Sequence, residues 1–114
     1  MRKNCKEAMH AWTISKTKKT ADSIWTENGK MYSYNTVILQ RKWDAITGQR
    51  TFYLNMTKYS VTTSIHQNAI YSALRRVYPD AIFIVFRDLP LNVYDLTDFY
   101  PSDEHNYTIE ECVA

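Results

Sequence analysis

Cationic and aromatic side chains alternate through the first half of this chain, and this combination could carry out binding chemistry. Lysine and arginine bind phosphate backbones, and nucleic-acid bases stack on aromatic rings. The tightest combination is Arg41-Lys42-Trp43, at the expected end of a strand. The candidate nucleic-acid-binding residues are Lys16, Lys18, Lys19, Arg41, Lys42, Trp43, Tyr71 and Arg75. The alternative is that the rings fill a small core and the lysines keep the surface solvated.

The last part of the chain has the opposite character. No Lys or Arg follows Arg87, whereas seven Asp and Glu residues do, and aromatic residues are interleaved with them. Such a segment could bind a basic groove on a partner protein. The candidate protein-binding residues are Asp95, Asp98, Phe99, Tyr100, Asp103 and Glu104. The alternative is that the segment folds back on the basic half of its own chain.

Patterns typical of catalysis or metal binding are weak. Cys5, His10, His105 and Cys112 lack the closely spaced ligand pairs of a structural zinc site, and the two thiols are expected to be free. His66 lies beside Thr and Ser residues that a helix start selects anyway. We therefore predict no cofactor, no metal and no catalytic residue. A metal-dependent nuclease is the third choice of function, because two-metal chemistry needs more clustered acids than this chain offers.

Length and charge favour one small domain. The chain has 114 residues, 45% of them hydrophobic, and a formal net charge of +2. Residues 1–60 contain 11 Lys and Arg against 4 Asp and Glu, whereas residues 61–114 contain 3 against 8. No signal peptide or membrane-spanning stretch is recognisable, so we expect a cytoplasmic protein without a membrane partner.

Three strands are expected before residue 60. The first covers residues 23–27 and leads into Asn28-Gly29, the strongest short signal for a hairpin turn. A return strand over residues 30–41 is rich in Tyr, Val, Ile and Thr, which suit a pleated surface. A third strand over residues 50–56 shows alternating apolar residues.

A helix and a final strand follow. Ser64 and Gln67 match a capping box, and apolar residues then recur at helical spacing, so a helix is expected over about residues 64–77. On its other side Gln67, Tyr71 and Arg75 form one stripe. Residues 81–86 are continuously apolar and predict a buried strand.

These elements predict an α+β fold. The expected order is β-β-β-α-β, with a small antiparallel sheet packed on one amphipathic helix. The single domain, residues 1–114, would consist of a basic arm (1–20), a core (21–87) and an acidic, aromatic extension (88–114).

Two stretches carry a resemblance to a known group of proteins. Ser33-Tyr34-Asn35-Thr36-Val37-Ile38 matches the pattern SYxTxI, and residues 59–67, Tyr-Ser-Val-Thr-Thr-Ser-Ile-His-Gln, match YSxTTSxHQ. The chain thus resembles, over about residues 29–78, a group of small uncharacterised proteins of phages, prophages and archaea. That resemblance implies a mobile-element origin and brings no catalytic residues.

Together these observations predict a non-catalytic accessory protein that binds a macromolecule. Nucleic acid bound through the basic half is the first hypothesis. The alternative is an inhibitor of a host or defence protein, of the anti-CRISPR type, that acts by occlusion. The oligomeric state stays open at this point.

Overall fold

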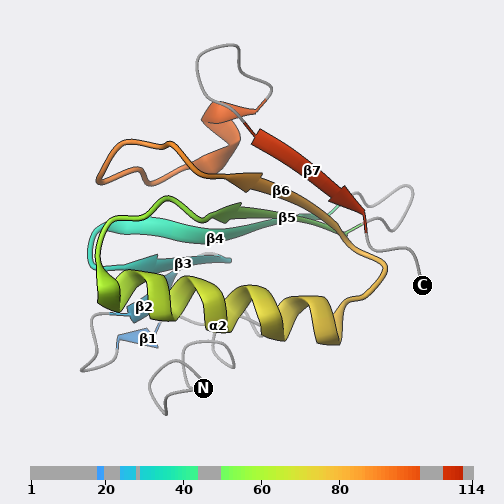
Figure 1. Ribbon diagram of the computed structural model, residues 1–114, viewed down its shortest axis with the longest axis horizontal. Coiled ribbons are helices and arrows are strands. Elements are labelled where there is room, and N and C mark those ends of the chain that lie inside the picture. The colour runs from blue at the N-terminus through green and yellow to red at the C-terminus, as the bar shows by residue number, and fades with distance from the viewer. Residues whose placement is uncertain (1–17, 20–23, 28, 44–49, 101–106, 112–114) are drawn as a thin grey trace.

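The computed structural model describes residues 18–19, 24–27, 29–43, 50–100 and 107–111. They form one seven-stranded sheet, one α-helix and a short 3-10 helix, which confirms the α+β class (Figure 1). The elements are β1 (Lys18–Lys19), β2 (Ile24–Glu27), β3 (Lys30–Ser33), β4 (Thr36–Trp43), β5 (Arg50–Asn55), α2 (Val61–Val77), β6 (Ile82–Phe86), η1 (Leu96–Phe99) and β7 (Tyr107–Glu111).

The strands lie in the sheet in the same order as in the chain. All neighbours are antiparallel except β5 and β6, which are parallel and are joined by α2. The predicted small antiparallel sheet on one helix is confirmed in part: the sheet is mostly antiparallel, but it has one parallel pair, and the predicted order β-β-β-α-β is not confirmed. A helix between two adjacent strands carries the chain back to its starting end, so the second strand runs parallel to the first.

The hairpin at Gly29 is confirmed. Glu27 pairs with Lys30, and Gly29 has φ 75°, the left-handed conformation that a two-residue turn requires. A Cβ at Gly29 would lie 3.3 Å from Nε of Arg41 on β4, so the side chain of Arg41 lies against this turn. The turn thus aligns β2 with β3 and brings Arg41 beside it.

The return strand predicted over residues 30–41 is in fact two strands, β3 and β4. Tyr34 and Asn35 form a turn between Ser33 and Thr36, which pair with each other. Tyr34 has φ 56°, and its carbonyl oxygen accepts a hydrogen bond from Nε1 of Trp25 on β2. Tyrosine rarely adopts this backbone conformation, so the residue type at this position did not predict a turn.

A bulge in β4 places two successive side chains on the same face. Met31 pairs with Leu39 and Tyr32 pairs with Val37, which leaves Ile38 as the extra residue. Ile38 and Leu39 both belong to the core that lies against α2. The strand therefore buries more apolar surface on the helix side than strict alternation allows.

Helix α2 begins three residues earlier than predicted. Ser60, rather than Ser64, is its N-cap, and the Ser60 side chain accepts a hydrogen bond from the backbone N–H of Thr63. The predicted cap residue Ser64 lies within the first turns of the helix. Arg75 and Arg76 lie in the last turn, where cations interact favourably with the helix dipole.

Both faces of the sheet are covered. Ile70 and Leu74 of α2 pack on one face, against Phe52 and Phe83. On the other face, the segment after β6 lies across the sheet, with Leu89, Val93 and Leu96 in a second core that includes Tyr32, Val37, Tyr53, Ile84 and Phe86. The prediction of a sheet packed on one helix therefore did not include the third layer, which the segment after β6 forms.

The predicted terminal boundaries also change. Of the predicted extension, residues 89–100 cover a sheet face and residues 107–111 form β7, which pairs with β6, so these described parts belong to the fold. Of the predicted basic arm, Lys18 and Lys19 form β1, and residues 1–17 lie outside the described part of the chain. No helix in the described residues is long and apolar enough to cross a membrane.

Candidate functional site

Arginines from three elements lie around the C-terminal end of α2. Arg41 on β4 pairs with Phe52, whose ring belongs to the α2-side core, so Arg41 lies on that face of the sheet. The guanidinium carbon of Arg50 lies 5.1 Å from the ring centre of Tyr78, the C-cap of α2. Arg75 and Arg76 lie in the helical turn just before it. We call these four residues, Arg41, Arg50, Arg75 and Arg76, the basic end.

Aromatic rings form a continuous support beneath the basic end. The ring centres of Tyr78 and Phe52 lie 5.1 Å apart, those of Phe52 and Phe83 5.6 Å, and those of Phe83 and Tyr71 6.0 Å. Arg75 lies over both of the last two rings, at 5.3 Å from Tyr71 and 5.8 Å from Phe83. Cation–π contacts of this kind hold long side chains in place at small cost in solvation.

One carboxylate of β7 reaches the basic end. Oε2 of Glu110 lies 2.8 Å from Nη1 of Arg75 and accepts a hydrogen bond from the hydroxyl of Tyr71, and Oε1 lies 3.7 Å from Nη2 of Arg87. Burial and the hydrogen bond to Glu110 raise the pKa of Tyr71, so its hydroxyl stays protonated and donates. Tyr71 and Arg75, both predicted to bind nucleic acid, are thus engaged by the protein's own acid.

Of the other predicted nucleic-acid-binding residues, Lys18, Lys19 and Lys42 lie on strand positions apart from this group. Lys42 is exposed and pairs with Thr51, on the face of the sheet opposite to Arg41. Trp43 ends β4 and pairs with Arg50. Lys18 and Lys19 belong to β1, at the sheet edge three strands from β4, and Lys16 lies outside the described residues.

A chain of hydroxyl groups joins the two stretches that carry the phage-like resemblance. Oγ of Ser33 lies 3.1 Å from Oγ1 of Thr63 and 3.1 Å from Nδ1 of His66. Thr63 also accepts a hydrogen bond from Oγ of Ser60, at 3.1 Å. His66 is 0% exposed. This network fixes the start of α2 on β3, which is a structural role for four of the matched residues.

Gln67 and Tyr59 complete the same junction. The side-chain amide of Gln67 donates to the carbonyl oxygens of Asn55 and Thr57, at 2.7 and 2.9 Å. The hydroxyl of Tyr59 donates to the carbonyl oxygens of Leu89 and Pro90. The pattern YSxTTSxHQ therefore describes a helix entry whose polar side chains are used inside the molecule.

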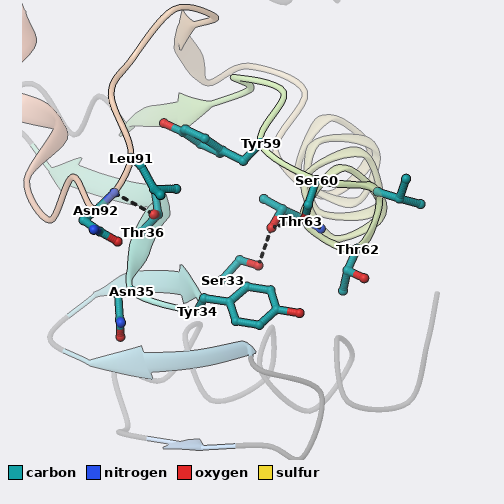
Figure 2. A pocket seen from close by; sticks show the side chains of 11 residues that line it. Ser33, Tyr34, Asn35, Thr36, Tyr59, Ser60, Thr62, Thr63, Leu91 and Asn92 are labelled. Atoms are coloured by element: carbon teal, nitrogen blue, oxygen red, sulfur yellow. Dashed lines mark hydrogen bonds between the residues drawn. The ribbon is translucent and has the colours of Figure 1, made fainter.

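A pocket of about 360 Å³ opens beside this junction (Figure 2). It lies between the β3–β4 turn, the start of α2 and the loop after β6, and no charged side chain lines it among the described residues. Three exposed apolar side chains form part of its rim: Tyr34 (52% exposed), Val61 (79%) and Leu91 (64%). Its lining residues are Ser33, Tyr34, Asn35, Thr36, Tyr59, Ser60, Val61, Thr62, Thr63, Leu91 and Asn92.

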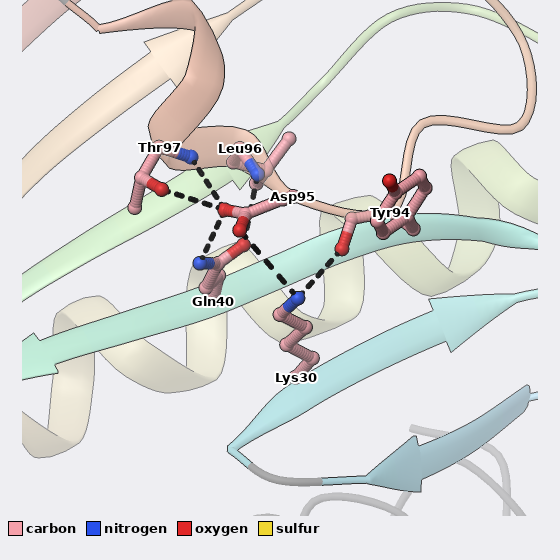
Figure 3. A network of polar contacts seen from close by, with 6 residues as sticks. All are labelled: Lys30, Gln40, Tyr94, Asp95, Leu96 and Thr97. Atoms are coloured by element: carbon pink, nitrogen blue, oxygen red, sulfur yellow. Dashed lines mark hydrogen bonds and ion pairs between the residues drawn. The ribbon is translucent and has the colours of Figure 1, made fainter.

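Asp95, predicted to bind a protein, is held inside its own chain (Figure 3). Its Oδ1 accepts hydrogen bonds from the amide of Gln40 at 2.9 Å and from the backbone N–H and hydroxyl of Thr97, and Lys30 lies 3.9 Å from Oδ2. Partial burial by itself raises the pKa of Asp95. The hydrogen bonds from Thr97 and Gln40 and the charge of Lys30 outweigh this and lower the pKa below its usual value.

The remaining protein-binding candidates divide into two groups. Phe99 and Tyr100 are partly buried and pack on the second core, where the ring of Tyr100 lies 6.1 Å from Tyr53 and 5.0 Å from Tyr107. Asp98 is exposed in η1. Asp103 and Glu104 lie outside the described residues. Asp95, Phe99 and Tyr100 therefore fit the alternative in which this segment folds back on its own chain.

Some contributors to the site were not among the predicted residues. Arg50 and Arg76 join the basic end, and Glu110 neutralises part of it, although none of the three was selected from the sequence. Arg76 had a usable signal, since it lies next to Arg75 in a recognisable helix. Within the described residues, no three His, Cys, Asp or Glu side chains are placed to hold a metal ion.

Comparison of the chain with models of protein families, with curated proteins and with solved structures gives no match. The geometry of the basic end and of the uncharged pocket therefore carries the functional argument. The phage-like resemblance stays a prediction.

Proposed function

We propose that this protein is a non-catalytic nucleic-acid-binding protein, of the accessory type found in phages and other mobile elements, and that the basic end contacts phosphates. The observation that carries the proposal is the position of Arg41, Arg50, Arg75 and Arg76 on β4, β5 and α2, at the end of the fold where α2 ends. Guanidinium groups bind phosphate oxygens through two parallel hydrogen bonds, which lysine cannot do.

The chemistry of the side chains supports a polyanionic ligand. The basic end contains four arginines; among the described residues, Glu110 is bound to Arg75, and the exposed Asp80 lies in the connection after α2. Arginines already aligned over aromatic rings lose little rotamer freedom when they bind. A positive surface of this kind gives affinity that depends on salt and little on base sequence.

Fluorescence anisotropy with labelled single- and double-stranded DNA and RNA tests the proposal. Arg76→Glu is the most informative variant, because Arg76 is exposed and its reversal does not break a contact with Glu110. We expect it to weaken binding about fivefold or more at low salt. Lys58→Glu is the matched control: Lys58 is also exposed but lies between β5 and α2, at the other end of the helix. We expect this control to change affinity by less than about twofold.

Two results would reject the proposal. One is no binding to any probe at about 100 μM protein and about 50 mM salt, because non-specific binding proteins reach this affinity. The other is equal loss for Arg76→Glu and Lys58→Glu, which would reflect net charge rather than a defined surface.

A second candidate function is inhibition of a host or defence protein by occlusion. The uncharged pocket supports it, because Tyr34, Val61 and Leu91 expose apolar surface around hydrogen-bonding groups, as protein-binding surfaces do. Tyr34→Ser combined with Leu91→Ser should abolish capture of a partner, whereas Tyr94→Ser, at an exposed tyrosine outside the pocket, should keep it. If the double variant still captured the partner, the pocket would be excluded as the binding surface.

A further inference from the structure

The uncharged pocket beside the start of α2 is separate from the basic end. Its volume of about 360 Å³ falls within the range of about 300–1,000 Å³ that is typical of sites for small molecules. Helix α2 has 17 residues and spans about 25 Å, and the pocket lies at its first residues, whereas Arg75 and Arg76 lie in its last turn. A ligand in this pocket would therefore bind independently of the basic end.

Two turns with an unusual backbone conformation border the pocket. Among the described residues other than glycine, those with positive φ are Tyr34, at 56°, and Asn92, at 64°, and both line the pocket (Figure 2). The backbone N–H of Asn92 donates to Oγ1 of Thr36 at 2.9 Å, and that of Val37 donates to the carbonyl oxygen of Val93 at 2.7 Å. These bonds to β4 hold the loop after β6 in place. Left-handed residues that their surroundings hold in this way cluster at ligand sites, so the walls of the pocket are formed before a ligand binds.

The polar side chains of the pocket divide into two groups. The hydroxyls of Ser33 and Thr36 take part in internal hydrogen bonds. Within the described part of the chain, no hydrogen bond engages the hydroxyl of Thr62 or the side-chain amide of Asn92, although both residues line the pocket. A hydroxyl and an amide each offer a donor and an acceptor, so they suit a ligand whose own groups do both. Alcohol hydroxyl groups have this property and carry no charge.

Apolar surface lies next to these polar groups. The side chains of Tyr34 and Leu91 are 52% and 64% exposed at the rim of the pocket. A tyrosine ring provides a flat apolar surface with a polar hydroxyl at its end. A sugar ring has the matching character, because C–H groups cover its faces and hydroxyl groups surround its edge. Sites for small molecules generally combine apolar walls with a few polar groups that fix the orientation of the ligand.

We propose that this pocket binds a neutral sugar ring, carried either by a free saccharide or by a nucleoside. The ring of Tyr34 packs on a C–H face of the sugar, and the hydroxyl of Thr62 and the amide of Asn92 bind its hydroxyl groups. Binding here does not require that the basic end bind nucleic acid, because the two sites lie at opposite ends of α2. In the second candidate function a protein covers the same rim, and a titration with sugars separates the two occupants.

Two-dimensional NMR of the isotope-labelled full-length protein tests the proposal. Neutral mono- and disaccharides form one arm, at up to about 20 mM, and uncharged nucleosides form the other, at up to about 5 mM, because few contacts give affinities near the millimolar range. We expect the backbone amide signals of Tyr34, Thr62 and Asn92 to shift in a saturable way in at least one arm. The signals of Arg75 and Arg76 should stay unchanged. The arm that responds identifies the source of the sugar ring.

Variants that keep the backbone conformation separate lost contacts from lost folding. Asn92→Gly and Tyr34→Gly each remove one side chain from the pocket, and glycine adopts a positive φ without strain. We expect each variant to raise the dissociation constant of the responding sugar about fivefold or more. The NMR spectrum of each variant shows directly whether it is folded. Affinity for DNA should stay at the wild-type level in both, which distinguishes this site from the basic end.

Asn68→Ala is the matched control. It removes an exposed amide of α2 that does not line this pocket, so it should change the dissociation constant by less than about twofold.

The site is refuted by any of three results. If no saccharide or nucleoside caused a saturable shift, the rim would be left to a protein partner. If inorganic phosphate shifted the signals of Tyr34 and Asn92 while the sugars did not, the start of α2 would bind an anion instead. Wild-type affinity in the folded glycine variants, or an equal loss in Asn68→Ala, would show that the sugar does not bind in this pocket.

Discussion

Ser33 and His66 are 33 residues apart in the chain, and Oγ of Ser33 lies 3.1 Å from Nδ1 of His66 in the interior of the protein. The same hydroxyl also contacts Thr63. One small side chain on β3 thus provides hydrogen bonds for two residues of α2.

Replacing Ser33 by Ala should therefore destabilise the fold. The change leaves two buried polar groups without this partner, which costs about 1–3 kcal/mol in the free energy of unfolding. Urea denaturation measures the effect. Ser72→Ala is the matched control, since Ser72 is exposed on α2 and alanine is the better helix former there, so its stability should stay equal or rise slightly. A loss below about 0.5 kcal/mol for Ser33→Ala would show that the network does not anchor α2.

The left-handed conformation of Tyr34 predicts an unusual order of stability among variants at this position. Glycine adopts φ 56° without strain, whereas alanine and tyrosine do not. Tyr34→Gly should thus be more stable than Tyr34→Ala by about 1 kcal/mol, the reverse of the order found at ordinary positions. Thermal melting of the two variants provides the comparison. If alanine proved the more stable, the turn between β3 and β4 would not impose this conformation.

The lowered pKa of Asp95 predicts a pH dependence of stability. A carboxyl group whose pKa is lower in the folded state stabilises the fold above its ordinary pKa, and this contribution is lost as the pH falls through that range and below. Asp95→Asn should therefore be less stable than wild type at pH 7, and the difference should shrink toward acid pH. Unfolding free energies of the two proteins between about pH 7 and pH 2.5 measure it. A difference that does not change with pH would assign the effect to lost hydrogen-bond geometry alone.

Glu110 offers a test that separates binding from stability. Glu110→Gln removes the negative charge beside Arg75 and Arg87, so the basic end becomes more positive. If this surface binds phosphates, affinity for DNA should rise by about two- to tenfold at low salt, although the fold loses an ion pair. Asp98→Asn, which removes an exposed acid on the opposite side of the sheet, serves as the control and should change affinity less. Equal gains for both variants would indicate a general effect of net charge.

Local patterns were enough to predict part of the fold. The Asn28-Gly29 hairpin, the apolar stripe with Ile70 and Leu74, and the strand at Ile82–Phe86 are confirmed, because turn chemistry and periodicity act over a few residues. The break at Tyr34 was not predictable in this way, since a side chain from β2, Trp25, supports a conformation that tyrosine does not prefer.

Tertiary contacts decide the rest. The sequence of β7 contains two acids and two hydroxyl-bearing residues, so no local pattern predicts a strand there. Its strand conformation depends on pairing with β6. Arg41 and Arg75 were selected separately, and their position at the same end of the fold depends on the parallel crossover through α2. The neutralisation of Arg75 by Glu110 joins residues 35 positions apart, which no local pattern reports.

The order of the strands in the sheet also bears on how the chain can fold during synthesis. Each strand pairs with the one made just before it, so every new strand that leaves the ribosome finds its neighbour already present. The longest waits are at the crossover through α2, where residues 56–81 separate β5 from β6, and at the connection of residues 87–106 between β6 and β7. Pairing between neighbours in the chain keeps loop-closure entropy small and favours rapid, vectorial folding from the N-terminal strands onward.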